Sequence, residues 1–145
     1  MTSSRSRRRG NVMMEFGLAF PLLFLFLSGM YQFGYAFFVY NQLQSAVRTG
    51  ARYAATTDFD GTAGSSFKSR VQNVVVYGVP TGGSTPVVKG LTTSKVSVTW
   101  LGDAMSIPQT VTVGISDFSF YAVFRTFTLS DKPKATFIYM GQYVT

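Results

Sequence analysis

Residues 15–40 read EFGLAFPLLFLFLSGMYQFGYAFFVY and set the architecture of the whole chain. After Glu15 the next charged side chain is Arg48, and Phe, Leu, Met and small residues dominate the interval. A bilayer core about 30 Å thick is crossed by about 20 apolar residues in a helix that rises about 1.5 Å per residue. We therefore predict one membrane-spanning helix, whose second half becomes more amphipathic near the far interface.

The residues before this segment are basic, and they predict its orientation. Four arginines precede the first acidic residue, namely Arg5, Arg7, Arg8 and Arg9. Because basic residues beside a spanning segment stay in the cytoplasm, we expect a single pass through the inner membrane, with the N-terminus inside and the remainder in the periplasm or outside. The apolar region runs into aromatic residues instead of a small-residue cleavage site, so no cut is expected beyond it.

The charge of the chain is concentrated in this leader. The 145 residues carry a net charge of +7, but without residues 1–10 nine basic and six acidic residues remain, a net charge of +3. A nucleic-acid-binding surface requires basic residues spread over a folded face, so no nucleic-acid partner is expected. A polybasic arm is the remaining alternative for the leader.

The pattern after the apolar segment predicts an α+β fold. Apolar residues recur every three or four positions to the end of a helix expected over about Val12–Ala55, and a short amphipathic helix from about Phe67 ends near Gly78. Alternation with period two predicts strands around 96–100 and 111–115 with a hairpin-like connection at 102–108 between them, and residues 134–143 resemble a third strand. We expect these strands to form a small antiparallel sheet on the outer half of the long helix. The aromatic residues around 118–127 fit neither period.

Catalysis has little support in the composition. The chain contains no His and no Cys, which removes the usual general base, the thiolate nucleophile and the commonest metal ligands. Asp58 and Asp60 lie two apart in a loop, but a calcium site needs six or more oxygen ligands and no known loop spacing surrounds them. We expect a protein that is not an enzyme and has no cofactor or metal.

One acidic residue lies at the entrance of the apolar segment. A carboxylate there must stay near the headgroups, pair with a cation or become protonated, so Glu15 is costly unless it has a partner. If the chain were cut after Gly10, Asn11 would carry a new positive amine. Glu15 could then pair with this amine or with the amine of a neighbouring subunit.

At these residues the sequence resembles type IV prepilins, whose basic leader ends in Gly and is removed before the hydrophobic segment, with Glu at the fifth residue beyond the cut. More narrowly, it resembles the TadE family of pilin-like proteins over about residues 8–55. The residues that carry this resemblance are Arg9, Gly10, Asn11 to Phe16, Phe20 to Leu23, Gln32 to Gly34 and Asn41 to Ala55.

The resemblance implies a minor pilin or pseudopilin of a tight-adherence (Flp type IVb) pilus. Its partners would be a prepilin peptidase, other pilin or pseudopilin subunits, a secretion ATPase, an inner-membrane assembly platform and the lipid bilayer. Residues 1–10 would then be a cleaved leader, 11–55 the transmembrane and extended helix, and 56–145 a small exterior α+β domain. The mature subunit would lie in the membrane or in the pilus.

A second hypothesis stays open beside this one. The chain could keep its leader as a signal anchor and use the exterior domain to bind a partner or an envelope component. In that case Gly10 is a linker and Glu15 an unpaired interfacial residue. Cleavage after Gly10 and self-association that depends on Glu15 discriminate between the two hypotheses.

Overall fold

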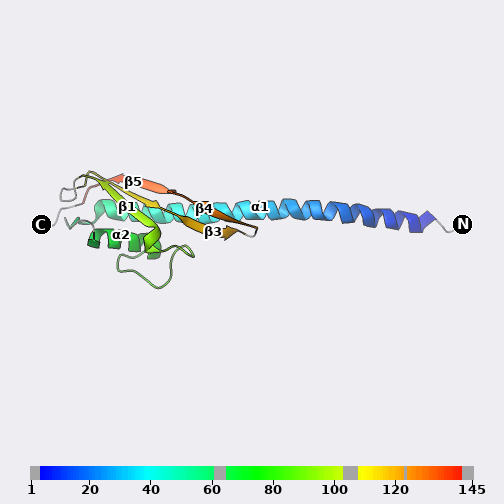
Figure 1. The fold of residues 1–145 in the computed structure, drawn as a ribbon, viewed down its shortest axis with the longest axis horizontal. Helices are drawn as coiled ribbons and strands as arrows, with labels where there is room; N and C mark the ends of the chain where they lie inside the picture. Colours follow the sequence, from blue (N-terminus) through cyan, green and yellow to red (C-terminus); the bar gives the residue numbers. More distant parts are fainter. Residues whose placement is uncertain (1–3, 61–64, 103–107, 123, 142–145) are drawn as a thin grey trace.

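The computed structural model describes residues 4–60, 65–102, 108–122 and 124–141, and its longest element is the helix α1, Ser4–Thr56 (Figure 1). Its 53 residues correspond to about 80 Å at the usual helical rise. The N-terminal half of α1 extends alone, and the other elements gather along its C-terminal half (Figure 1). The predicted α+β class, with a long helix, a short helix and small antiparallel sheets, is confirmed.

The start of α1 differs from the expectation. The sequence pattern predicts a helix from about Val12, whereas α1 begins at Ser4 and includes the basic leader. The periodic apolar residues begin late, but arginine is itself a good helix former and the leader contains no proline to stop the helix. Gly10 therefore lies inside the helix, where glycine costs about 1 kcal/mol relative to alanine. The predicted end at Ala55 agrees with the observed end at Thr56.

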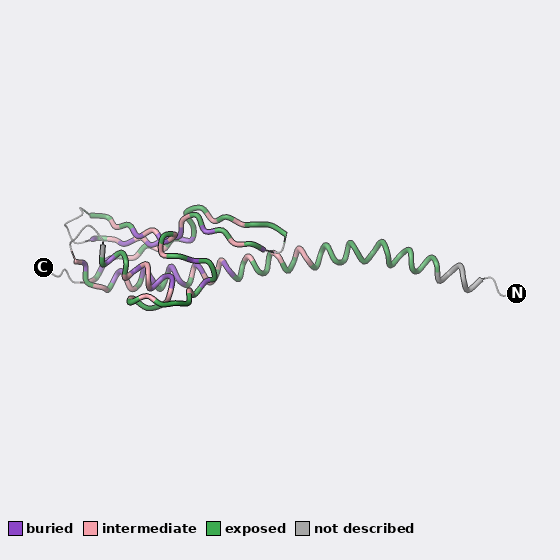
Figure 2. Tube along the Cα trace, turned by 60° about the horizontal axis from the view of Figure 1, so that its bottom comes forward, coloured by how far each residue is buried: buried purple, intermediate pink, exposed green. Residues whose placement is uncertain are grey.

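Burial divides α1 into two halves (Figure 2). Residues 10–27 are exposed, and from Val39 onward one side of the helix is buried. We call residues 16–38 the apolar half of α1, and we call α1 from Val39 onward, with α2 and the two sheets, the α+β unit. The stripe that the sequence periodicity predicted is buried and confirmed, with members Val39, Leu43, Ala46, Val47, Gly50, Ala51 and Ala54.

The second helix, α2, spans Ser65–Tyr77 and packs on α1. The two helices pack tightly at Gly50, where an added Cβ would overlap Cγ2 of the fully buried Val75. α2 ends as predicted at Gly78, whose φ of 79° is a conformation that glycine adopts without a steric penalty. Ser66 lies within α2 and donates a hydrogen bond to Asp60.

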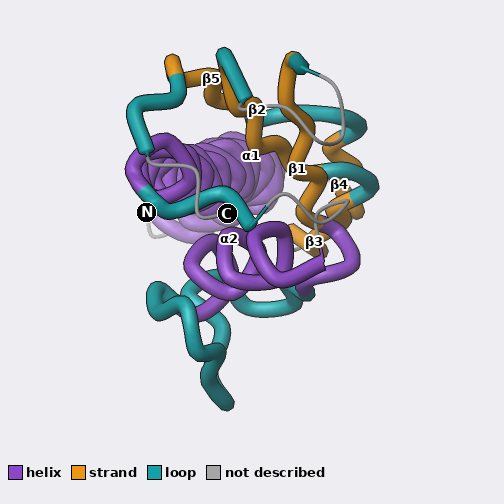
Figure 3. Tube along the Cα trace, turned by 90° about the vertical axis from the view of Figure 1, so that its left-hand side faces the viewer, coloured by secondary structure: helices purple, strands orange, loops and turns teal. Residues whose placement is uncertain are grey.

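The first sheet is antiparallel and has the strand order β1-β2-β5. Its strands are β1 (Val96–Leu101), β2 (Thr110–Ile115) and β5 (Lys134–Ile138), and the short 3-10 helix η1 (Thr93–Lys95) precedes β1. Alternate valines of β1 and β2 point into the core, as the period-two pattern predicted. Viewed along α1, α2 and this sheet lie on two different sides of the helix (Figure 3).

The third strand of this sheet is shorter than the sequence predicted. The third strand was expected over 134–143 but ends at Ile138, because the next two backbone N–H groups bond outside the β5 ladder, to the carbonyls of Gln109 and Ala55. Tyr143 and most of the expected connection at 102–108 lie outside the described residues. Antiparallel pairing of Val98 with Val113 still agrees with a hairpin-like connection between β1 and β2.

The second sheet is a two-stranded hairpin that the sequence pattern did not predict. β3 (Phe118–Ala122) pairs antiparallel with β4 (Arg125–Leu129), and Phe120 lies opposite Phe127. Alternation is present, because the side chains of β3 are buried or half-buried at every second position. It was obscured in the sequence by Tyr121, which is large, apolar and exposed.

Tyr139 joins the end of the first sheet to the end of α1. Its side chain is buried, and its hydroxyl donates a 2.9 Å hydrogen bond to the carbonyl of Thr57. It is thus a core residue and not an exposed aromatic. Burial raises the pKa of Tyr139, the negative charge of Asp58 adds to the rise, and a hydrogen bond to the backbone at Phe59 opposes it.

This environment predicts a pH-dependent contribution of Tyr139 to stability. We expect Tyr139→Phe to lose about 0.5–1.5 kcal/mol at neutral pH, because the Thr57 carbonyl loses its partner. With its pKa raised in the folded state, the tyrosine ionises first in the unfolded state. Its contribution is therefore full below the ordinary tyrosine pKa of about 10 and is lost as the pH rises through that value and beyond.

The measurement is urea unfolding of the detergent-solubilised chain from neutral to alkaline pH, followed by Trp100 fluorescence. Tyr121→Phe at an exposed position is the matched control. The difference in stability between wild type and Tyr139→Phe should shrink as the pH rises. A difference that is independent of pH contradicts the prediction.

Candidate processing and membrane-contact site

The predicted processing and pairing residues lie close together near the N-terminal end of α1, where its described side chains begin. Gly10, Asn11 and Glu15 are all exposed. Residues four apart in an α-helix lie on the same face, so the backbone nitrogen of Asn11 and the side chain of Glu15 are one turn apart on one side of α1. The predicted leader arginines, Arg5, Arg7, Arg8 and Arg9, have helical backbone, but their side chains lie outside the described part.

Gly10 has open space around it. A Cβ added there would meet no atom within 4 Å outside its own helix backbone, and the same holds for Gly17. Both glycines can therefore be replaced in the isolated chain without a steric clash. A requirement for glycine at position 10 would come from a partner that recognises this position.

The apolar half of α1 exposes large hydrophobic side chains along its length. They include Phe16, Leu18, Phe24, Leu25, Phe26, Leu27, Met30, Phe33 and Phe37. A continuous surface of this kind is not stable in water and marks contact with lipid or with other apolar helices. Among the described residues, one helix is long and apolar enough to cross a membrane, with a mean hydropathy of 1.8 in its most apolar window. It fits a single-pass membrane anchor.

Pro21 lies inside this helix. Its ring carries no N–H, so the carbonyl of Gly17 loses its usual helical partner, and the helix is locally weakened. Proline is nonetheless common in membrane-spanning helices, where neighbouring groups satisfy the freed carbonyl.

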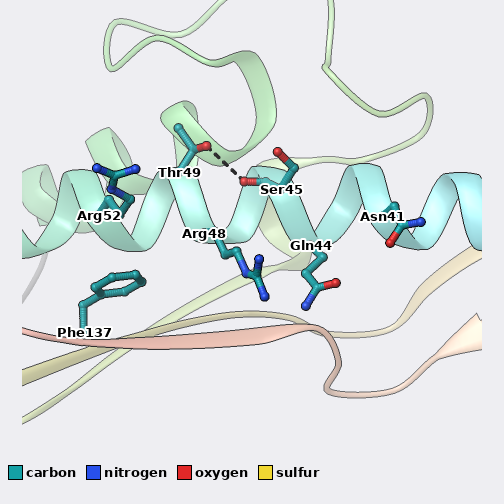
Figure 4. A pocket seen from close by; sticks show the side chains of 7 residues that line it. All are labelled: Asn41, Gln44, Ser45, Arg48, Thr49, Arg52 and Phe137. Carbon is teal, nitrogen blue, oxygen red and sulfur yellow. Dashed lines mark hydrogen bonds between the residues drawn. The ribbon is translucent and has the colours of Figure 1, made fainter.

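A polar groove lies on the opposite half of α1, within the α+β unit (Figure 4). It encloses about 740 Å³, and its lining residues are Asn41, Gln44, Ser45, Arg48, Thr49, Arg52 and Phe137. Arg48 and Gln44 extend from α1 on the side where β5 lies (Figure 4). The hydroxyl of Thr49 donates a 3.0 Å hydrogen bond to the carbonyl of Ser45. The groove offers positive charge and hydrogen-bond donors, and its lining has no acidic side chain or histidine that could activate the hydroxyls of Ser45 and Thr49.

Asp58 and Asp60, which were considered as calcium ligands, instead make hydrogen bonds to α2. Asp60 accepts a hydrogen bond from Ser66, and the carbonyl of Asp58 accepts one from Arg70 at 3.1 Å, so both attach the loop to α2. Within the described residues, no three carboxylates or other ligand side chains gather in one place.

An element beside α1 that sequence reasoning missed is the β3–β4 hairpin (Figures 1 and 2). Phe120 faces Tyr35 of α1 in an edge-to-face contact with ring centres 6.3 Å apart. A sequence signal for the hairpin does exist. Apolar residues stand two positions apart on each side of the turn, Phe118 and Phe120 before it and Phe127 and Leu129 after it.

Comparison with known proteins supports the sequence resemblance. A family model described as TadE-like protein matches residues 10–52. No curated protein and no solved structure matches the chain. The matched residues include Gly10, Glu15, the apolar half of α1 and most of the buried stripe of α1. Residues 10–52 are therefore a TadE-like segment, which supports, in general terms, a pilus-associated protein with a membrane-anchoring helix.

Proposed function

We propose that this chain is a minor pilin-like subunit, a pseudopilin, of a tight-adherence pilus system. A prepilin peptidase cuts it between Gly10 and Asn11. The mature helix then anchors it in the inner membrane, with the α+β unit on the outer side. The observation that supports the proposal is the TadE-like match over residues 10–52, which includes Gly10 and Glu15. With the proposed cut, Glu15 is the fifth mature residue.

Removal of the leader changes the electrostatics around Glu15. In the uncut chain α1 has no acidic residue in its first turn, and Glu15 lies three turns from the helix start. After the cut the helix starts at Asn11, which places a positive amine and unpaired backbone N–H groups one turn from the carboxylate. The same carboxylate can pair with the amine of a neighbouring subunit, and this pairing in the bilayer favours lateral assembly.

The proposed partners follow from this route. They are the prepilin peptidase, other pilin or pseudopilin subunits, the inner-membrane assembly platform with its ATPase, and the bilayer. The exposed apolar half of α1 is the surface for subunit and lipid contacts. The α+β unit supplies binding surfaces, including the polar groove at Arg48, and no catalytic group is assigned to it.

The test is the intact mass and N-terminal sequence of the membrane-extracted chain, made with and without a co-expressed prepilin peptidase. We expect a new N-terminus at Asn11 only when the peptidase is present. Gly10→Leu should abolish the cut, whereas Gly17→Leu should leave it unchanged, because both replacements enter open space in the isolated chain.

Self-association of the processed chain in detergent is the second readout. Glu15→Gln should keep the processing and weaken the association, because the pair with the amine is lost. An unprocessed N-terminus under every condition would overturn the pseudopilin proposal. That result would favour the signal-anchored protein that binds a partner through its outer domain.

A further inference from the structure

The closed end of the β3–β4 hairpin lies beside the apolar half of α1. Beside the α+β unit, strand residues of the hairpin share an apolar cavity of about 190 Å³ with residues of α1 between Phe33 and Tyr40. Farther toward the N-terminus of α1, Phe124 at the end of the hairpin shares a second cavity of about 330 Å³ with Phe24, Leu27, Ser28 and Tyr31. The hairpin therefore reaches along α1 past Val39 and lies beside part of the apolar half (Figures 1 and 2).

This position can be compared with the thickness of a bilayer. Residues 24–31 lie about 14–24 Å from Glu15 along the helix axis, and the hydrocarbon core is about 30 Å thick. With Glu15 at one boundary, the level of Phe124 falls in the half of the bilayer nearer the α+β unit. If α1 spans the membrane, the end of the hairpin cannot remain in bulk water.

The side chains at this end suit a membrane interface. Tyr121 and Phe124 are 67% and 62% exposed. Arg125 is also exposed, and it is the only charged residue between 118 and 130. Aromatic rings favour the headgroup level, and an arginine stem can lie along apolar chains while its guanidinium reaches a phosphate. Tyr31 of α1 lies at the same level and fits the same belt.

We propose that the end of the β3–β4 hairpin is a second membrane contact of this protein. Tyr121 and Phe124 enter the leaflet nearest the sheets of the α+β unit, below its headgroup boundary, and Arg125 extends its stem toward that boundary and binds lipid phosphate. Only the end enters, because the hairpin is a two-stranded sheet whose outer edges carry backbone groups that lipid cannot satisfy. Two contacts fix both the height and the rotation of the α+β unit on the membrane. The inference rests on the proposed membrane anchoring of α1.

The chain contains no cysteine, so single cysteines can be labelled selectively. The full-length chain carries an environment-sensitive fluorophore at Phe124→Cys and is reconstituted into vesicles of phosphatidylcholine and phosphatidylglycerol. The matched control is Leu101→Cys, whose wild-type side chain is 64% exposed and ends β1 at the opposite end of the α+β unit. Leu25→Cys in the apolar half of α1 reports whether the helix itself is in the bilayer.

Lipids that carry a nitroxide at the headgroup or at mid-chain locate each label. We expect the label at position 124 to be blue-shifted, quenched by the lipid nitroxides and protected from aqueous iodide. The label at 25 should be quenched most by the mid-chain nitroxide, and the label at 101 should be quenched by neither and accessible to aqueous iodide.

Three results would overturn the inference, and they are distinguishable. Quenching by lipid at 25 with full iodide access at 124 removes the hairpin contact and leaves the anchor intact. Lack of lipid quenching at both 25 and 124 removes the anchor and the inference together. Protection of 124 from iodide that grows with the protein-to-lipid ratio, without lipid quenching, assigns the hairpin end to a second copy of the chain.

Discussion

Replacing Phe67 with alanine is expected to lower the free energy of unfolding of the α+β unit by about 3–5 kcal/mol. Phe67 is fully buried where α2 meets the first sheet. Its ring contacts Phe59 at 5.3 Å and Trp100 at 6.2 Å between ring centres, both edge to face. Truncation removes these contacts and leaves a cavity among side chains that are held by both the sheet and α1.

The measurement is urea unfolding in detergent micelles, with fluorescence of Trp100, the only tryptophan, as the signal. Phe124→Ala is the matched control, since this phenylalanine is 62% exposed and its removal should change stability by no more than about 0.5 kcal/mol in micelles. Similar losses for the two variants would show that Phe67 does not belong to the core.

The second large effect is expected for Gly50→Leu, at about 3 kcal/mol of destabilisation. The new side chain would occupy the position of the buried Val75, and the carbonyl of Val71 lies 3.8 Å from the first added carbon. Val75 is β-branched and has little rotamer freedom in a helix, so α1 and α2 must separate. The better helix propensity of leucine offsets only about 1 kcal/mol.

Gly34→Leu separates the steric effect from the helix propensity. A side chain at this position of α1 meets no atom within 4 Å, so it keeps the propensity gain without the overlap. Thermal unfolding of both variants should show a large loss for Gly50→Leu and no loss for Gly34→Leu. Equal stability of the two variants would mean that α1 and α2 do not pack at Gly50.

Local patterns were sufficient to predict much of this fold. The stripe from Val39 to Ala54 is visible because a helix buries every third or fourth residue, and β1 and β2 are visible because strands alternate. The start of α1 was placed late because arginines carry no apolar periodicity although they favour helix. The β3–β4 hairpin was missed because an exposed aromatic residue, Tyr121, interrupts its alternation.

The candidate site was predictable for a different reason. Gly10, Asn11 and Glu15 are neighbours in sequence, so their spacing alone places them on one helix face. The position of Phe124 beside residues 24–31 depends on how a distant hairpin packs on α1, and no local pattern encodes such a contact. The polar groove at Arg48 likewise requires Phe137 from β5, almost 90 positions later in the chain.

The uninterrupted course of α1 makes the molecule a lever. The same helix contributes both the apolar half and the buried stripe that ends at Ala54, with no linker between them. Apart from the local weakening at Pro21, its base and its far end therefore move together. From Glu15 to Thr56 the helix measures about 60 Å, so a tilt of about 20° at the base carries the far end sideways by about 20 Å. A small tilt of the helix at its base becomes a large displacement of the α+β unit.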